Sequence, residues 1–386
     1  MKIAYYCQHV LGIGHYHRSV EICKALAENH EVSLIVGGPE VDPAPEPIQT
    51  YKLPGLQMDS NFLNLAPCDA GATLEDVKER RTAMLMDFFR EQRPDAFVVE
   101  LYPFGRKAFR FELDPVLKAI RNHTLPHCKC YVSLRDILVE RPNDRDKFEN
   151  RVITILNSLF DGLLIHSDEN IITLDETFHR YDDIAIPLAY TGFVTPLVTS
   201  DSRDSLRQTL NLEYEDKLVV VSIGGGNVGT ELLRASIDAF RLLSERTDLH
   251  MQLFTGPYFP DDEFLHLQEI LPSRVTLNRF ANNFSEWLQA ADLSISMAGY
   301  NTCMNIVQAG VPSLVYPFAQ NREQAFRASK LQKKANIRIL TFDDLIPTKL
   351  AAEIIAFSDM PRLSVAVNIS GATQSRIQIE AWHNSN

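Results

Sequence analysis

A glycine-rich segment in the second half of the sequence has the composition of a phosphate-binding turn. Gly224-Gly225-Gly226-Asn227 directly follows the apolar run 218–223, and a helical pattern begins near Glu231. Glycine allows backbone N–H groups to approach a phosphate closely, and the N-terminus of a helix contributes a positive partial charge. The segment therefore predicts an anion site, with a tight structural turn as the alternative.

A second turn of this kind follows the apolar run 293–296. The segment 297–302 contains Gly299 and leads into a helical pattern over 302–309, whose N-terminus favours negative charge. Two such turns at the edge of one sheet predict a diphosphate site. A third polar segment, 316–324, carries side chains that suit sugar hydroxyls, and its alternative is a solvated helix start with Glu323 near the helix dipole.

The first half offers a candidate general base. Gly12-Ile13-Gly14-His15 follows the first apolar run, but the third glycine of a dinucleotide fingerprint is missing, so an NAD site is weakly supported. Glu100 ends the apolar run 96–99. Either His15 or Glu100 is expected to accept the proton of an acceptor hydroxyl. The alternative for Glu100 is an ion pair with Arg106 or Arg135.

Four polar residues near the predicted strand ends are candidates for binding an acceptor. They are Arg18, Arg106, Arg135 and Asp136. Arg135 and Asp136 directly follow the apolar run 131–134, just as Glu100 directly follows the run 96–99. They either bind the acceptor or pair with each other.

Charge and composition narrow the function classes. The 386 residues include 50 acidic and 38 basic side chains, and the net charge of −12 disfavours nucleic acid as the main partner. The six cysteines form no C-x-x-C pair, which predicts reduced thiols. The sequence contains no run of about 18 apolar residues, so no membrane-spanning segment is expected. Arg80 and Arg81 precede an apolar stretch, 84–89, which predicts an amphipathic helix with a buried face, or alternatively a peripheral membrane contact.

The order of apolar runs and helical patterns predicts two α/β domains. Strands are expected near 3–7, 32–36, 96–100, 130–134 and 162–166, and again at six positions between 218 and 340. The segment 37–70 is rich in proline and polar residues and predicts long surface loops. The predicted domains are 1–195, 196–368 and a C-terminal helix in 369–386 that packs back on the first domain.

The turns together resemble those of glycosyltransferase family 28. Gly224-Gly225-Gly226 resembles the family's glycine-rich turn, 279–284 its base-binding segment, 299–312 its phosphate and ribose helix, and 321–324 its donor-sugar segment. This likeness covers about residues 218–335. Across nearly the whole chain the sequence is similar to a predicted-glycosyltransferase branch of the same superfamily, through 12–18, 100–106 and 133–138.

The resemblance implies a GT-B fold, in which two doubly wound Rossmann-like α/β domains face a cleft. The acceptor would bind to the N-terminal domain and the donor to the C-terminal domain. Where the family usually has a glutamate that holds the ribose, this chain has Asn305, which cannot make a charge-assisted contact. The implied donor-binding residues are Gly14, Gly224, Gly225, Gly226, Asn227, Phe280, Ala281, Met297, Ala298, Gly299, Tyr300, Asn301, Thr302, Asn305, Gln320, Asn321, Glu323 and Gln324.

The function implied is that of a hexosyltransferase that uses a nucleotide sugar, most simply a UDP-sugar. Inverting transfer without a metal or a cofactor is expected, to a small-molecule or lipid-linked acceptor, in the cytoplasm or peripherally at the inner membrane face. A nucleotide-sugar hydrolase and a non-catalytic nucleotide-sugar-binding protein are the alternatives, and an oxidoreductase is the weakest.

Overall fold

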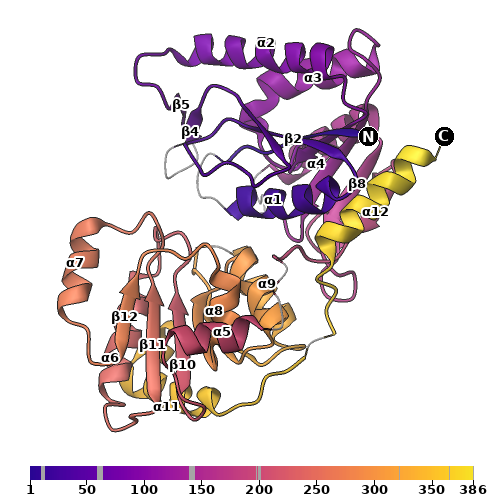
Figure 1. Ribbon diagram of the computed structural model, residues 1–386. Coiled ribbons are helices and arrows are strands. Elements are labelled where there is room, and N and C mark those ends of the chain that lie inside the picture. Colours follow the sequence, from indigo (N-terminus) through magenta and orange to yellow (C-terminus); the bar gives the residue numbers. More distant parts are fainter. Residues whose placement is uncertain are drawn as a thin grey trace. The chain divides into compact units, whose positions relative to one another are not determined.

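The chain folds into two compact units, each built around a parallel sheet (Figure 1). The first unit comprises Met1–Val194 and Asn368–Asn386, and the second comprises Thr195–Val367. The computed structural model describes residues 1–9, 14–58, 64–138, 144–196, 198, 201–320, 322–364 and 366–385.

The sheet of the first unit has seven described strands in the order β3-β2-β1-β6-β7-β8-β9. Its central strands are buried along most of their length and mainly apolar because helices cover both faces, as expected for parallel strands. Tyr6 of β1 lies beside Ile35 of β2 and Val99 of β6. The strands are β1 (Lys2–Tyr6), β2 (Glu31–Val36), β3 (Gln49–Lys52), β6 (Ala96–Glu100), β7 (Lys129–Arg135), β8 (Gly162–His166) and β9 (Leu188–Tyr190).

Helices cover this sheet on its two faces. On one face α1 packs against the C-terminal helix α12, whose Trp382 stacks on Tyr131 of the sheet with ring centroids 5.7 Å apart (Figure 1). On the other face α2, α3 and α4 build the larger apolar core. The helices are α1 (Gly14–Ala27), α2 (Leu74–Gln92), α3 (Arg110–Arg121), α4 (Arg145–Leu159) and α12 (Gly371–Asn384), with 3₁₀ turns at Lys107–Phe109, Leu174–Glu176 and Tyr181–Asp183.

The prediction of long loops across 37–70 is partly wrong. Gln49–Lys52 forms the parallel edge strand β3, and β4 (Leu56–Met58) pairs with β5 (Leu65–Pro67) in a small antiparallel sheet. These strands have only three or four residues, and β3, with the sequence Gln-Thr-Tyr-Lys, also lacks the apolar run that a buried strand would show.

Helix α2 packs into the core, as an amphipathic helix with a buried face should. Leu85, Phe88 and Phe89 are buried. Arg81 is also fully buried, because its guanidinium donates to both carboxylate oxygens of Glu112 at 2.6 and 2.8 Å. Arg81 is therefore not available for a peripheral membrane contact, whereas Arg80 is exposed. Among the helices described, none is both long and apolar enough to cross a bilayer.

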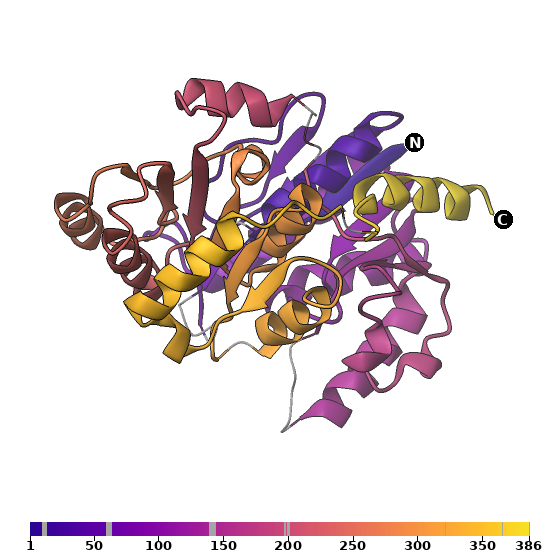
Figure 2. The same ribbon diagram turned by 90° about the horizontal axis from the view of Figure 1, so that it is seen from below.

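The sheet of the second unit has the described order β12-β11-β10-β13-β14-β15. Figure 2 shows the chain from below, with the helices and strands of this unit in rose to gold. Helices α6 and α11 pack together over an apolar face, and α5 packs against α8. The strands are β10 (Lys217–Ser222), β11 (Leu249–Phe254), β12 (Val275–Asn278), β13 (Leu293–Met297), β14 (Ser313–Tyr316) and β15 (Ile337–Ile339). The helices are α5 (Ser202–Thr209), α6 (Thr230–Arg241), α7 (Asp261–Glu269), α8 (Phe284–Ala290), α9 (Tyr300–Ala309), α10 (Arg322–Leu331) and α11 (Pro347–Ser358), with a 3₁₀ turn at Phe342–Leu345.

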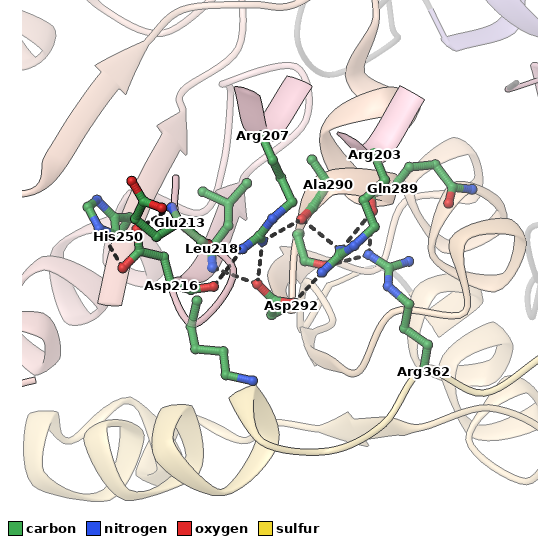
Figure 3. A network of polar contacts seen from close by, with 12 residues as sticks. Arg203, Arg207, Glu213, Asp216, Leu218, His250, Gln289, Ala290, Asp292 and Arg362 are labelled. Carbon is green, nitrogen blue, oxygen red and sulfur yellow. Dashed lines mark hydrogen bonds and ion pairs between the residues drawn. The ribbon is translucent and has the colours of Figure 1, made fainter. Parts of the chain in front are cut away.

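An arginine cluster holds the end of α8 at the edge of the sheet where β10 and β13 begin (Figure 3). Arg203 and Arg207 of α5 each donate to Asp292, at 2.7 and 2.9 Å, and the Leu218 amide donates to the same carboxylate at 2.8 Å. Arg362 donates to carbonyls of α8, including that of Gln289 at 2.5 Å. The cluster thus pairs the carbonyls that a helix C-terminus leaves without intrahelical partners.

Asp292→Asn is expected to lower the free energy of unfolding by about 3 kcal/mol at pH 7, because two guanidinium groups lose their counter-charge. Burial alone would raise the pKa of Asp292, but the Leu218 amide and the two arginines together lower it. A lowered folded pKa means that the stabilisation is complete above the unfolded value of about 3.9 and is lost as the pH falls below it. Urea unfolding of both proteins at pH 7 and pH 3 measures this, and equal midpoints at pH 7 would contradict it.

Candidate functional site

In the first unit, the structure brings His15 and Glu100 together. Glu100 ends β6, and His15 lies in the first turn of α1, with its Nδ1 2.7 Å from Glu100 Oε1. The Glu100 side chain is fully buried, whereas the His15 side chain is 22% exposed. The pair therefore has one member that solvent or a substrate can reach and one member that they cannot.

Two arginines surround the same carboxylate. Arg18 stands three residues after His15 on α1, on the same helix face, and its Nη2 donates to Glu100 Oε1 at 2.5 Å. Arg106 Nε lies 3.6 Å from the other oxygen. The alternative in which Glu100 pairs with Arg106 thus holds alongside the contact with His15.

The turn that returns Arg106 to Glu100 has an unusual backbone. Leu101 and Arg106 have φ of +67° and +54°, a region that non-glycine residues seldom adopt. A Cβ atom at Gly105 would lie 2.6 Å from the Leu101 side chain, so a larger residue there would force that side chain to shift. Strained backbone of this kind gathers at functional sites.

The electrostatics give the pair distinct protonation states. Burial alone would raise the pKa of Glu100, but His15, Arg18 and Arg106 outweigh it and hold the pKa well below its usual range. Burial lowers the pKa of His15 to about 4, against the opposing pull of Glu100. At neutral pH Glu100 is ionised and His15 is neutral.

These states determine which nitrogen of His15 carries the proton. An ionised carboxylate only accepts hydrogen bonds, so the 2.7 Å contact requires Nδ1 of His15 to carry the hydrogen. The other nitrogen, Nε2, then has the lone pair. The arrangement can take a proton at Nε2, and Glu100 stabilises the imidazolium that forms.

A row of buried polar side chains on the same sheet was not anticipated from the sequence. Ser133 Oγ lies 2.8 Å from the Tyr5 hydroxyl and 2.7 Å from His166 Nε2, and His166 Nδ1 lies 2.9 Å from the Thr191 hydroxyl. Burial lowers the pKa of His166 to about 3, so this ring is neutral. The available signal was a serine and a histidine near the ends of two otherwise apolar strands.

The other predicted acceptor-binding residues differ in burial and in partners. Arg18 is buried as a partner of Glu100, and Arg135 is half-buried at the end of β7. Asp136 is buried and accepts from the Ile137 amide at 2.9 Å. Gly14, which was expected to bind the donor, is the exposed first residue of α1, while Gly12 and Ile13 lie outside the described residues.

In the second unit, the glycine turn after β10 is open on one side and packed on the other. Gly224 and Gly226 have φ of +73° and +95°. A Cβ atom at Gly226 would lie 2.7 Å from the Phe259 amide nitrogen and from the Thr255 carbonyl, whereas one at Gly224 would meet nothing within 4 Å. Gly224, Gly225 and Asn227 are exposed, so the turn presents backbone to solvent directly before α6.

The turn after β13 leads into α9 as expected from the sequence. Met297, Ala298 and Tyr300 are buried and Gly299, Asn301 and Thr302 are half-buried. Arg327 of α10, which the sequence reading did not single out, is 1% exposed and lies over the Tyr300 ring, 5.4 Å from its centroid. The buried guanidinium places a positive charge behind this turn.

The candidates for ribose and sugar binding have partners within the second unit. Asn305 is buried and accepts from the Thr195 hydroxyl at 2.9 Å. Gln324 Oε1 accepts from the Phe318 amide at 3.0 Å, and Glu323 lies 4.0 Å from Arg327. Gln320 is exposed, and Asn321 lies outside the described residues.

Two aromatic rings are exposed in the turns that follow β11 and β12. Phe280 is 45% exposed, beside the half-buried Ala281. Tyr258, which the sequence analysis missed, is also 45% exposed, and its ring would lie 3.7 Å from a Cβ atom at Gly225. Its amide donates to the Gly225 carbonyl at 3.0 Å. The signal for Tyr258 was its position after β11, the strand next to β10.

Among the described residues, no group of three or more histidine, cysteine, aspartate or glutamate side chains is arranged to hold a metal ion. All six cysteines, each within the described residues, are free thiols.

Comparison with known proteins finds a family match over the second unit. Residues 220–368 match the model of the glycosyltransferase family 28 C-terminal domain. A Helicobacter pylori (strain ATCC 700392 / 26695) relative, UDP-N-acetylglucosamine--N-acetylmuramyl-(pentapeptide) pyrophosphoryl-undecaprenol N-acetylglucosamine transferase, is 27% identical over 133 residues, which are 33% of this chain and 36% of the relative. The chain thus spans little more than a third of that relative's length.

Solved structures extend the likeness to both units. The glycotransferase of kitacinnamycin is similar with a TM-score of 0.62 and 16% identity, covering 99% of this chain and 98% of that one. A UGT transferase from Siraitia grosvenorii, solved in complex with UDP, is similar with a TM-score of 0.58 and 12% identity, covering 98% and 99%. The predicted GT-B fold and the predicted family 28 resemblance of the second half are confirmed.

Proposed function

We propose that this chain, which has the GT-B fold and a family 28 C-terminal domain, is a glycosyltransferase that moves a sugar from a nucleotide-sugar donor to an acceptor hydroxyl. The observation that carries the proposal is the pairing of neutral His15 with buried, ionised Glu100. A binding protein has no need of an oriented base, whereas activation of a hydroxyl requires one.

The donor is proposed to bind to the second unit as a UDP-sugar. Backbone N–H groups of 224–226 and of the turn before α9 would hold the diphosphate, with Phe280 and Tyr258 beside the nucleoside. The relative from Helicobacter pylori is named for a UDP-sugar, and the transferase from Siraitia grosvenorii was solved with UDP. Asn305 replaces the family's glutamate and supports a weaker hold on the ribose.

The proposed reaction is an inverting displacement. The acceptor oxygen forms a bond to the anomeric carbon, the bond from that carbon to the diphosphate breaks, and the nucleoside diphosphate leaves with its electrons. His15 Nε2 takes the acceptor proton. Helix N-termini and glycine-turn amides stabilise the charge that develops on the leaving group. By this account the acceptor binds to the first unit and the donor to the second.

The pH dependence of the reaction tests the state of His15. Because its folded pKa is about 4 rather than the ordinary value of about 6.5, the ring stays unprotonated as the pH falls from 8 to 5. The acid limb of kcat/KM should therefore lie near pH 4 and not near pH 6.5. A plot of kcat/KM against pH measures this, and a tenfold loss of rate between pH 7 and pH 5.5 would contradict it.

Turnover of a UDP-sugar with and without acceptors separates the proposal from its two alternatives. A transferase releases UDP and forms a glycoside only when an acceptor is present. Equal release of free sugar in water alone would favour a hydrolase. Saturable binding without turnover across many hydroxyl acceptors would favour a non-catalytic nucleotide-sugar-binding protein.

A further inference from the structure

A cavity of about 240 Å³ lies within the first unit, where the strands β1, β2 and β3 end. Ligands of doubly wound sheets bind beyond the carboxyl ends of the strands, so this is a place where a substrate is expected. The cavity is lined by His9, Tyr16, residues 36–43, Thr50, Lys52, Leu53, Gly55 and Cys68.

Buried groups fix the wall of this cavity. Arg81 donates to the Gly37 and Pro54 carbonyls at 2.9 and 2.7 Å while Glu112 neutralises its charge. A Cβ atom at Gly37 would lie 2.1 Å from the Arg81 guanidinium, and one at Gly38 would lie 2.1 Å from the His9 carbonyl oxygen. The wall is thus held in place before any ligand arrives, which lowers the cost of binding.

Two buried polar atoms of the lining residues have no partner among the residues that the structure describes: His9 Nδ1 and Thr50 Oγ1. The Nε2 atom of His9, which is 3% exposed, lies 2.8 Å from the Pro39 carbonyl oxygen. A carbonyl only accepts, so Nε2 carries the hydrogen, and Nδ1 is left as an acceptor. A ligand that satisfies both atoms must therefore bring at least one O–H or N–H donor.

The charges at the cavity oppose an anion. Lys52 lies at the rim, 60% exposed, with its Nζ 3.9 Å from Glu40, and Asp42 adds a second carboxylate to the lining. The other walls are apolar and include Val36, Val41 and Leu53, together with Tyr16. Such a surface suits a ring with apolar faces and hydroxyl edges. A phosphate or carboxylate would meet two carboxylates against one ammonium group, and it has no hydrogen to donate to His9 Nδ1.

The cavity adjoins the proposed base. Tyr16 directly follows His15 on α1, and its ring centroid lies 5.3 Å from that of His9. The Tyr16 hydroxyl donates to the Asp42 carbonyl at 2.6 Å, which ties the first turn of α1 to the cavity wall.

We propose that this cavity is the acceptor subsite and that it binds a neutral ring bearing hydroxyl groups, with His9 and Thr50 as its hydrogen-bonding residues. The assignment as acceptor site depends on the proposed glycosyltransferase function. Binding of the ring itself does not, and it is measured without any donor.

Cys68 provides a direct readout, because it lines the cavity and is the one exposed cysteine among the six. Alkylation of Cys68 by iodoacetamide in the full chain is followed by mass spectrometry with added methyl glucoside, phenol or glucose 6-phosphate. The expected result is protection by at least one of the two neutral compounds, which identifies a sugar or a phenolic ring, and at least tenfold weaker protection by the phosphorylated sugar.

Thr50→Val keeps the shape of the side chain and removes its hydroxyl. It should weaken protection about tenfold, as expected for one lost hydrogen bond. Thr154→Val, at an exposed site on α4, is the matched control and should leave protection unchanged.

Three results would overturn the proposal: protection of Cys68 by glucose 6-phosphate equal to that by methyl glucoside, unchanged protection in Thr50→Val, or no protection by either neutral compound. Failure of UDP-sugar turnover with intact protection would instead count against the proposed function alone.

Discussion

His15→Gln should reduce kcat for sugar transfer by a factor of about 10² to 10⁴, the range expected for loss of a general base. The physical reason is the geometry of the pair, since Nδ1 of His15 faces Glu100 and Nε2 is the nitrogen with a lone pair. Glutamine keeps a polar side chain of similar reach but cannot take a proton at neutral pH. Steady-state kinetics with a saturating donor measure the loss.

His17→Gln is the matched control for this variant. His17 lies two residues later on the same helix and is exposed, so its replacement removes an imidazole without touching Glu100. Its kcat should stay within a factor of two to three of the original protein, roughly the scatter of surface substitutions. Equal activity of the His15 and His17 variants, with unchanged melting temperatures, would show that His15 is not the base.

Gly225→Asp should lower the affinity for the nucleotide by a factor of roughly 100 or more. A carboxylate on this turn would face the diphosphate, and two unit charges about 4 Å apart repel by about 4 kcal/mol at an effective dielectric constant near 20. The side chain has room, because a Cβ atom at Gly225 would meet only Tyr258 and Asn227, at 3.7 and 3.9 Å. The melting temperature should therefore change little, and calorimetry reports the affinity.

Gly225→Asn separates charge from bulk in this experiment. The two side chains have nearly the same size, so a loss seen with aspartate and largely absent with asparagine is electrostatic. An equal loss with both would mean that bulk alone blocks the turn. No loss with either would remove the glycine turn from the donor site.

The apolar strands of both units could be predicted because burial on two faces leaves a continuous apolar run. Expected strands at 96–100 and 162–166 agree with β6 and β8 at every residue. The edge strand β3 was not predicted because its sequence, Gln-Thr-Tyr-Lys, has no such run. Short edge strands gain their pairing from the sheet and not from local sequence.

The site could be predicted only in part, because many of its contacts join residues that are far apart in the chain. Strand-end position alone pointed to His15 and Glu100, which are 85 residues apart. Nothing local indicated that Arg81 would be buried, since its partner Glu112 is on another helix. Tyr258 and Arg327 stand in segments without a motif, and only the packing of neighbouring turns brings them near the candidate donor site.

The most direct test of the account is calorimetric titration of the purified protein with UDP and a UDP-sugar, beside GDP, TDP and NAD. The account predicts saturable binding of the uridine compounds, little heat from NAD, and loss of binding in Gly225→Asp. Absence of binding to every nucleotide at millimolar concentration would contradict the central claim that this fold holds a nucleotide-sugar donor.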